Sequence, residues 1–342
     1  MPHLRFLPTK YTLLLLFSAV LFFSCGENRL NVNVSEVEIA KPQIHRFDKD
    51  LFALSASNIA MGLPALQKSY PGYADLFIRN LLCPGGIADS SCTPEIIRFV
   101  NDKEMRKAYD DCQAIFSDMT PVENELAVVL KHYKYYWPHG GQPKFLAMMS
   151  GFNYAIEMHD STFSIGLEMY LGGQYKFYDM LHFPLYKRTV MRKEFVVRDL
   201  THAWMSKAFP NKSKSTSLLN EMVHQGKLLY LLDALMPATS DTIKIGFSKM
   251  QLDWCVDNEK NMWGHLIKNK LLYSNDIQTI TKFTGEGPFT TGFVKESPGR
   301  TGIWIGWQIV RRYMDNNPKI TLDQLMQEGD PQVILSRSQY KP

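Results

Sequence analysis

The chain has 342 residues, of which 45% are hydrophobic and 21% are charged, and its formal net charge at pH 7 is +4. This composition argues against a disordered, repetitive or low-complexity chain, and the length suffices for a large hydrophobic core. The small positive charge is not concentrated in any segment, which argues against a basic nucleic-acid-binding surface.

The first residues have the features of a secretory signal peptide. Arg5 and Lys10 form a basic start, and an apolar run over residues 11–23 follows. That run is shorter than the roughly 20 residues that a membrane-spanning helix needs. We therefore expect residues 1–24 to be a signal peptide that is removed on export.

Cys25 stands directly after this segment and is preceded by the small residue Ser24. This order is typical of a bacterial lipoprotein box, although Phe22 and Phe23 occupy the places where the tightest form has leucine and a small residue. We expect Cys25 to be acylated, since acyl chains hold a protein at a membrane, and residues 25–43 to form a tether. Ordinary signal-peptidase cleavage nearby, with Cys25 incidental, is the alternative.

Four cysteines remain in the exported chain: Cys83, Cys92, Cys112 and Cys255. Export would place them in an oxidising compartment, where disulfides form. The segment between Cys83 and Cys92 contains proline, glycine and serine and has the composition of a loop that a disulfide could close. We expect a Cys83–Cys92 disulfide, with free buried thiols as the alternative, and no spacing fits a zinc knuckle.

Residues 44–342 are expected to form a single globular domain, mainly helical, because no linker divides them convincingly. The domain opens with a charged cluster, which is most often a solvated face and consists of His45, Arg46, Asp48 and Asp50. A helical pattern then covers residues 58–137. One helix is expected to begin at Thr93, and another at Thr120, where Glu123 would complete a capping box.

The hydrophobic period changes between residues 144 and 170. Short runs separated by Gly151 and by a polar turn at 159–161 predict two or three antiparallel strands, and the second turn is expected to be a tight hairpin. Helical patterns then return over residues 193–209, 215–236 and 248–270, in a helix that follows Arg300, and in a short helix that begins with a capping box at Thr321.

The helix expected over residues 215–236 is the central element of the chain. It is apolar nearly all round, which predicts burial. Four residues form a polar seam on it: Asn220, His224 and Lys227, which share one face at i, i+4 and i+7, and Glu221 alongside. Buried polar groups lose stability unless they have partners, so the seam must find contacts inside the fold.

The seam also has the order Asn-Glu-x-x-His, which is the zinc-peptidase pattern His-Glu-x-x-His with its first ligand replaced. Asparagine is a poor zinc ligand, and Glu221 in the place of the general base has no metal-bound water to activate. If the seam held a metal, Glu259 on the next helix would be the best third ligand, and His265 and Asp257 would be weaker choices. We interpret the seam and Glu259 as a vestigial pocket, without a metal, a cofactor or a catalytic residue.

Four segments together resemble the family of the gliding-motility lipoprotein GldB. They are spread over most of the exported chain and cover residues 45–52, 220–237, 270–274 and 297–310. The resemblance implies an exported lipoprotein needed for the assembly or operation of a surface-motility machine. The family is similar in pattern to predicted zinc peptidases, and it has members where gliding is absent. The resemblance and the element order predict an α+β fold that is mainly α-helical and degenerate zincin-like, with one small antiparallel sheet.

Three functions are compatible with these features. The first, which we favour, is a non-catalytic component or assembly factor of the gliding-motility or envelope machinery. Its partners would be a membrane, through the lipid anchor, and other envelope or motility proteins. The second is a membrane-tethered zinc peptidase that uses His224, Glu259 and Asn220 as ligands and Glu221 as base. The third is a lipoprotein whose cleft binds a peptide or glycan without cutting it.

Overall fold

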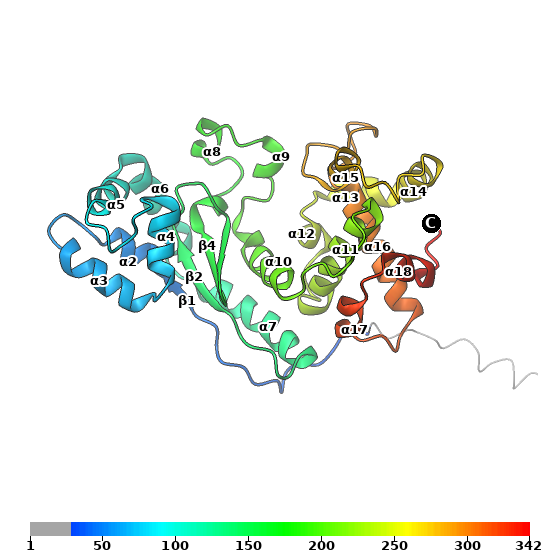
Figure 1. Cartoon of the computed structure of the whole chain (residues 1–342), viewed down its shortest axis with the longest axis horizontal. Helices are drawn as coiled ribbons and strands as arrows, with labels where there is room; N and C mark the ends of the chain where they lie inside the picture. Colours follow the sequence, from blue (N-terminus) through cyan, green and yellow to red (C-terminus); the bar gives the residue numbers. More distant parts are fainter. Residues whose placement is uncertain (1–28) are drawn as a thin grey trace, which may run out of the picture.

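The computed structural model describes residues 29–342, so the expected signal peptide and Cys25 lie outside the described residues. The described chain is mainly helical and has one four-stranded sheet, which confirms the predicted class (Figure 1). Within residues 29–342, none of the helices combines the length and the apolar character needed to cross a membrane.

The sheet has the strand order β1-β2-β4-β3. Its strands are β1 (Ile44–Arg46), β2 (Lys144–Met148), β3 (Ile156–His159) and β4 (Thr162–Gly166). The predicted hairpin is confirmed, because β3 and β4 pair antiparallel around the turn. The prediction of a purely antiparallel sheet is wrong, because β2 pairs parallel with both β1 and β4. A parallel pair needs a long crossover, and the helices between β1 and β2 supply one.

Helices lie on both sides of the sheet (Figure 1). The helices of the crossover on one side are α2 (Phe47–Phe52), α3 (Ile59–Ser69), α4 (Tyr73–Leu81), α5 (Cys92–Asn101) and α6 (Lys103–Phe116). On the other side are α7 (Thr120–Tyr136) and α10 (Val196–Ala208). Short elements connect β4 to α10, namely η2 (Leu167–Tyr170), α8 (Lys176–Met180), α9 (Leu185–Arg188) and η3 (Lys193–Phe195).

The C-terminal half is built around α11 (Leu218–Leu235). The other helices of this half are α12 (Asp241–Ile245), α13 (Lys249–Asp257), α14 (Glu259–Lys268), α15 (Ile277–Thr284), α16 (Thr301–Asn316), α17 (Leu322–Gln327) and α18 (Pro331–Ser338). The helix predicted over residues 248–270 is two helices that meet at Asn258. The predicted capping box at Thr321 is present and begins α17.

The charged cluster at the start of the domain is a solvated face only in part, because His45 and Asp50 are exposed but Asp48 is not. The carboxylate of Asp48 is fully buried and accepts hydrogen bonds from Nε of Arg46 at 2.8 Å and from Nη2 of Arg46 at 2.6 Å. Phe47, beside it, is buried between the rings of Tyr70 and Tyr73. The prediction is wrong for Arg46 and Asp48, because a buried ion pair and a solvated one have the same residue pattern.

The capping box predicted at Thr120 does not form. Met119 occupies the N-cap of α7 and makes no side-chain cap, whereas Oδ1 of Asp118 accepts a hydrogen bond from the backbone N–H of Thr120 at 2.8 Å. The carboxylate of Glu123 instead accepts a hydrogen bond from the backbone N–H of Ile44 at 2.9 Å. This contact fixes the start of β1 against α7, so a long-range partner has replaced the local one.

The described part of the expected tether lies against the body. Arg29 donates hydrogen bonds to the carbonyl oxygens of Met314, at 3.0 Å, and Ile320. The side chain of Leu30 is buried. Arg29 therefore attaches the start of this segment to the end of α16 and the loop after it.

Two of the cysteines are joined in the structure. The sulfur atoms of Cys83 and Cys92 are bonded at 2.01 Å, and the bridge closes the loop between α4 and α5. Cys112 and Cys255 are buried free thiols.

Helices α11 and α16 approach each other to backbone contact. A Cβ atom on Gly226 would lie 2.3 Å from the carbonyl oxygen of Gly306, and one on Gly306 would lie 1.8 Å from the carbonyl oxygen of Met222. These distances are far below any van der Waals contact, so only glycine fits at either position. The crossing lies in the centre of the hydrophobic core and fixes the distance between the two helices.

We expect Gly306→Ala to destabilise the protein by on the order of 3 kcal/mol or more, because the added methyl group must push the two helices apart. Urea unfolding of the purified protein measures this change. Gly264→Ala on α14 is the matched control, since nothing lies within 4 Å of its added Cβ. The control should stabilise the protein by about 0.5–1 kcal/mol through helix propensity. Equal effects of the two substitutions would contradict the close crossing.

Candidate functional site

Helix α11 begins at a side-chain cap and runs through the core. The hydroxyl of Ser217 accepts a hydrogen bond from the backbone N–H of Asn220. Helices α7, α10, α15, α16 and α18 pack around α11, so nearly all its residues are buried. Every polar side chain on this helix therefore needs a partner from another element or from its own neighbouring turn.

The predicted polar seam lies on α11 as expected, but its members point to different partners. Asn220 and Lys227 are buried, and Glu221 and His224 are half-buried. Lys227 donates from Nζ to the carbonyl oxygen of Glu328, just after α17. Glu221 accepts a hydrogen bond from Gln225, one turn along the same helix, at 2.9 Å. Lys227 and Glu221 thus make separate contacts within the fold.

Burial controls the protonation of two seam residues. It lowers the pKa of Lys227 to about 8, and the nearby Glu328 opposes this shift only in part. Burial also lowers the pKa of His224. At pH 7 His224 is therefore predominantly the uncharged imidazole. Lys227 remains mainly protonated at pH 7 and loses its proton near pH 8.

Glu259 has a partner of its own, away from the seam. Its carboxylate accepts a hydrogen bond from the hydroxyl of Tyr340 at 2.7 Å, and the Tyr340 ring packs edge-on against Trp263. His265, the weaker candidate, packs against Phe293. In the part of the chain that the structure describes, no group of three or more His, Cys, Asp or Glu side chains could hold a metal ion.

The structure reveals a polar network that the sequence did not predict, centred on Asp233 near the end of α11. One carboxylate oxygen, Oδ1, accepts from Nζ of Lys244 at 2.9 Å and from Nη2 of Arg311 at 2.8 Å. The other, Oδ2, accepts from Nε1 of Trp307 at 2.9 Å and from Nε of Arg311 at 2.8 Å. Four donors from α12 and α16 thus converge on one buried carboxylate.

Arg311 is the shared cation of this network. It also binds Asp241 through two hydrogen bonds of 2.8 and 2.9 Å, and its guanidinium lies 3.7 Å from the ring centroid of Trp307. Burial acts to lower the pKa of Arg311, but the hydrogen bonds that it donates to Asp233 and Asp241 outweigh burial and raise the pKa. We call these five residues the Asp233 network: Asp233, Asp241, Lys244, Trp307 and Arg311. The one sequence signal for it was a lone aspartate in the apolar run that ends α11.

Four members of the Asp233 network, namely Asp233, Asp241, Lys244 and Arg311, line a cavity of about 880 Å³ between α11, α12 and α16. Arg29 and Leu30 line it too, so the N-terminal segment forms one of its walls. A general base must offer a free lone pair to its substrate, whereas both oxygens of Asp233 already accept two strong hydrogen bonds. The arrangement is suited to holding three helices together and poorly suited to proton abstraction.

Comparison with known proteins gives one finding. The family model described as "Gliding motility protein GldB" matches residues 27–342. Neither the curated proteins nor the solved structures contain a match to the chain.

Replacing Asp233 with asparagine should destabilise the protein by about 3–5 kcal/mol, because the buried Lys244 and the half-buried Arg311 would lose their common counter-charge. Thermal or urea unfolding measures the change. Asp253→Asn is the control, since Asp253 pairs with Lys249 on the exposed face of α13. That change should stay within about 0.5 kcal/mol. A small effect at both positions would mean that the Asp233 network contributes little to stability.

Lys227 makes a prediction about pH. Its pKa is about 8 in the folded chain, below the ordinary value of 10.5. Between pH 8 and pH 10.5 the unfolded chain therefore binds more protons than the folded chain. Below pH 8 the lysine is charged in both states, and the cost of burying that charge lowers the stability of the folded chain. Folding stability should therefore rise with pH from about 8 to 10.5 by this group. In Lys227→Met this contribution is absent. The stability of the variant relative to wild type should thus be about 2 kcal/mol more favourable at pH 7 than at pH 9.5. A pH-independent difference would show that Lys227 is solvated.

Proposed function

Since the chain belongs to the family of the gliding motility protein GldB, we propose that it is an exported, acylated lipoprotein that acts as a non-catalytic component or assembly factor of the gliding-motility or envelope machinery. The family match covers all of the described residues, so the proposal starts from a motility-related lipoprotein. The non-catalytic role, the acylation and the assignment to a machine are the proposal.

The observation that carries the non-catalytic role is the state of the carboxylates that could act as a base. Glu221 is hydrogen-bonded to Gln225, Glu259 to Tyr340, and Asp233 to four donors. A metallopeptidase base instead faces a metal-bound water. The polar groups of α11 support a stabilising role, and a protein of this kind would act through its surface and its anchor.

The proposed anchor would hold the body close to the membrane. Only residues 26–28 separate Cys25 from Arg29, which is attached to the body by hydrogen bonds. Four residue steps span at most about 14 Å of extended chain. An acylated Cys25 would therefore keep the end of α16 and the neighbouring cavity within roughly that distance of the lipid headgroups. This geometry supports a role at the membrane surface of the envelope.

The test is complementation of a strain from which the chain's gene has been deleted. We expect Glu221→Gln to restore motility or envelope function as well as wild type, because the proposed role needs no general base. Colony spreading or secretion of envelope proteins is the readout, with immunoblots to equalise protein levels. Loss of function with Glu221→Gln at normal protein level would favour the alternative, a membrane-tethered zinc peptidase.

The matched control for the anchor is Cys25→Ser. This variant cannot be acylated through a thiol, so fractionation should find the body released from the membrane, whereas Glu221→Gln should stay bound. A Cys25→Ser protein that still sediments with membranes would contradict the lipid anchor but would leave the non-catalytic role standing.

A further inference from the structure

A second cavity, of about 400 Å³, lies between the two halves of the molecule. Residues of α9 and of the loop after it line one side, and the segment between α15 and α16 lines the other. Further walls come from α10 and from Gly246 and Phe247, which directly follow α12. Part of the wall is apolar and includes Met169, Phe183, Val190, Met191 and Phe247. The charged side chains that line it are Lys187, Arg198 and Arg300 with Asp199 and Glu286, so the cations outnumber the carboxylates.

Arg300 is the unusual residue of this cavity. It occupies the N-cap of α16 with φ of 60°, a left-handed conformation that is unfavourable for a residue with a side chain. Its guanidinium donates from Nη2 to the carbonyl oxygen of Ile245 at 2.9 Å and lies 5.5 Å from the ring centroid of Phe247. Among residues 29–342, no carboxylate lies within ion-pair distance of it.

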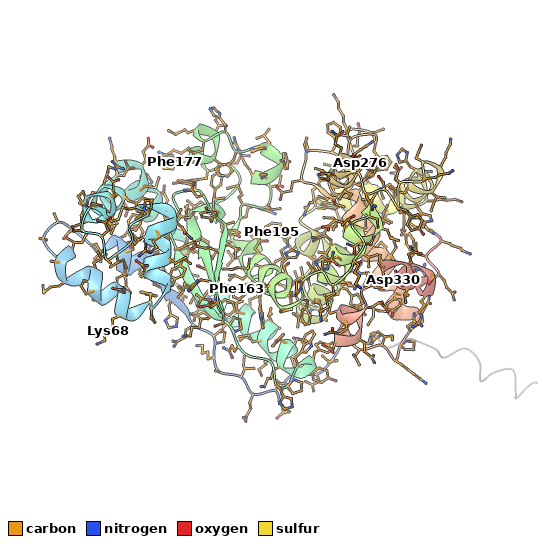
Figure 2. All side chains as sticks on the ribbon, in the orientation of Figure 1. Lys68, Phe163, Phe177, Phe195, Asp276 and Asp330 are labelled. Atoms are coloured by element: carbon orange, nitrogen blue, oxygen red, sulfur yellow. A yellow bond between two sulfur atoms is a disulfide. The ribbon has the colours of Figure 1, made fainter. Side chains whose placement is uncertain are left out.

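The second arginine, Arg198, reaches the same place from α10. Its Nε donates to the carbonyl oxygen of Lys244 at 2.9 Å, and Nη1 binds Asp199 at 2.5 Å. Its guanidinium also lies 6.0 Å from the ring centroid of Phe195, which Figure 2 labels just before α10. The Asp199 carboxylate also accepts a hydrogen bond from the hydroxyl of Tyr170, so both of its oxygens have a partner within the fold.

The two guanidinium groups converge on Gly246. A Cβ atom built there would lie 3.1 Å from Nη2 of Arg198 and 3.4 Å from Nη2 of Arg300. Gly246 has φ of +76°, so the sequence needs glycine there for the backbone as well. Two like charges thus face one small space that no side chain fills, an arrangement that disfavours the charged state of Arg300.

Neighbouring groups show the effect of these cations. Burial, and then the charge of Arg198, lower the pKa of Arg300 to about 10. Burial lowers the pKa of His202, one turn after Arg198 on α10, to about 3, and the two arginines add to this shift. His202 is therefore neutral and gives no further positive charge at pH 7. The groups that could offset the arginines are Asp199, which is paired, and Glu286, which pairs with Lys187 at 3.0 Å.

We propose that this cavity binds a phosphate group, held between Arg198 and Arg300 beside Gly246, with the uncharged body of the ligand against the apolar wall. A bound anion would relieve the repulsion between the arginines and supply the counter-charge that Arg300 lacks. The guanidinium groups come from two different elements, and a tetrahedral phosphate offers oxygens to both, whereas the two oxygens of a carboxylate are matched by one planar fork. The volume fits a small ligand.

Isothermal titration of the detergent-solubilised full-length protein with inorganic phosphate tests this proposal. We expect saturable binding by wild type and at least about tenfold weaker binding by Arg300→Gln. Arg300→Lys, which keeps the charge and loses the planar fork, should fall between them. Arg98→Gln is the matched control, because Arg98 is exposed on α5 and pairs with Glu95, and it should bind like wild type. Thermal melting verifies that each variant is folded.

Further titrations define the ligand. A titration with acetate tests whether a carboxylate can take the place of phosphate, and we expect acetate to bind more weakly than phosphate. Glycerol 3-phosphate and short-chain phosphatidylglycerol separate the two sources of a phosphate: tighter binding of the first indicates a soluble phosphate ester, and tighter binding of the second indicates a lipid headgroup. Absence of phosphate binding by wild type, equal binding by Arg300→Gln, or acetate binding as tight as phosphate would each overturn the proposal.

Discussion

The backbone contact between α11 and α16 is the constraint on which the rest of the structure depends. Gly226 and Gly306 remove the side chains that would keep the two helices at an ordinary distance. At this short distance, Trp307 and Arg311 of α16 reach the carboxylate of Asp233 on α11. The burial of an aspartate in a helix this apolar is stable only because its donors are held so close.

Helix α12 connects this constraint to the second cavity. The side chains of Asp241 and Lys244 belong to the Asp233 network, while the carbonyl oxygens of Lys244 and Ile245 accept hydrogen bonds from Arg198 and Arg300. One five-residue helix is therefore fixed by cations and carboxylates on two sides. The positions of Arg198 and Arg300 thus depend on the same packing that holds Asp233. A change in the crossing of α11 and α16 would therefore shift the lining residues of both cavities.

The carboxylates that resemble those of a zinc peptidase, Glu221 and Glu259, have partners within the fold. The helix order and the Asn-Glu-x-x-His sequence remain compatible with a common origin, but the carboxylates that a peptidase would use are bound to Gln225 and Tyr340. The family match rests on nearly the whole chain rather than on this motif. A motility-related lipoprotein in which α11 stabilises the core is consistent with both observations.

The sequence by itself determined the buried character of α11, the β3–β4 hairpin, the capping box of α17 and the helix that follows Arg300, because each depends on periodicity or on residues a few positions apart. Only the tertiary structure decided the parallel pairing of β2, the burial of Asp48, the use of Glu123 by β1, and the partners of Asp233 and Arg300. Those features join residues far apart in the chain, and a local pattern of polar residues is the same whether the partner is water or a distant helix.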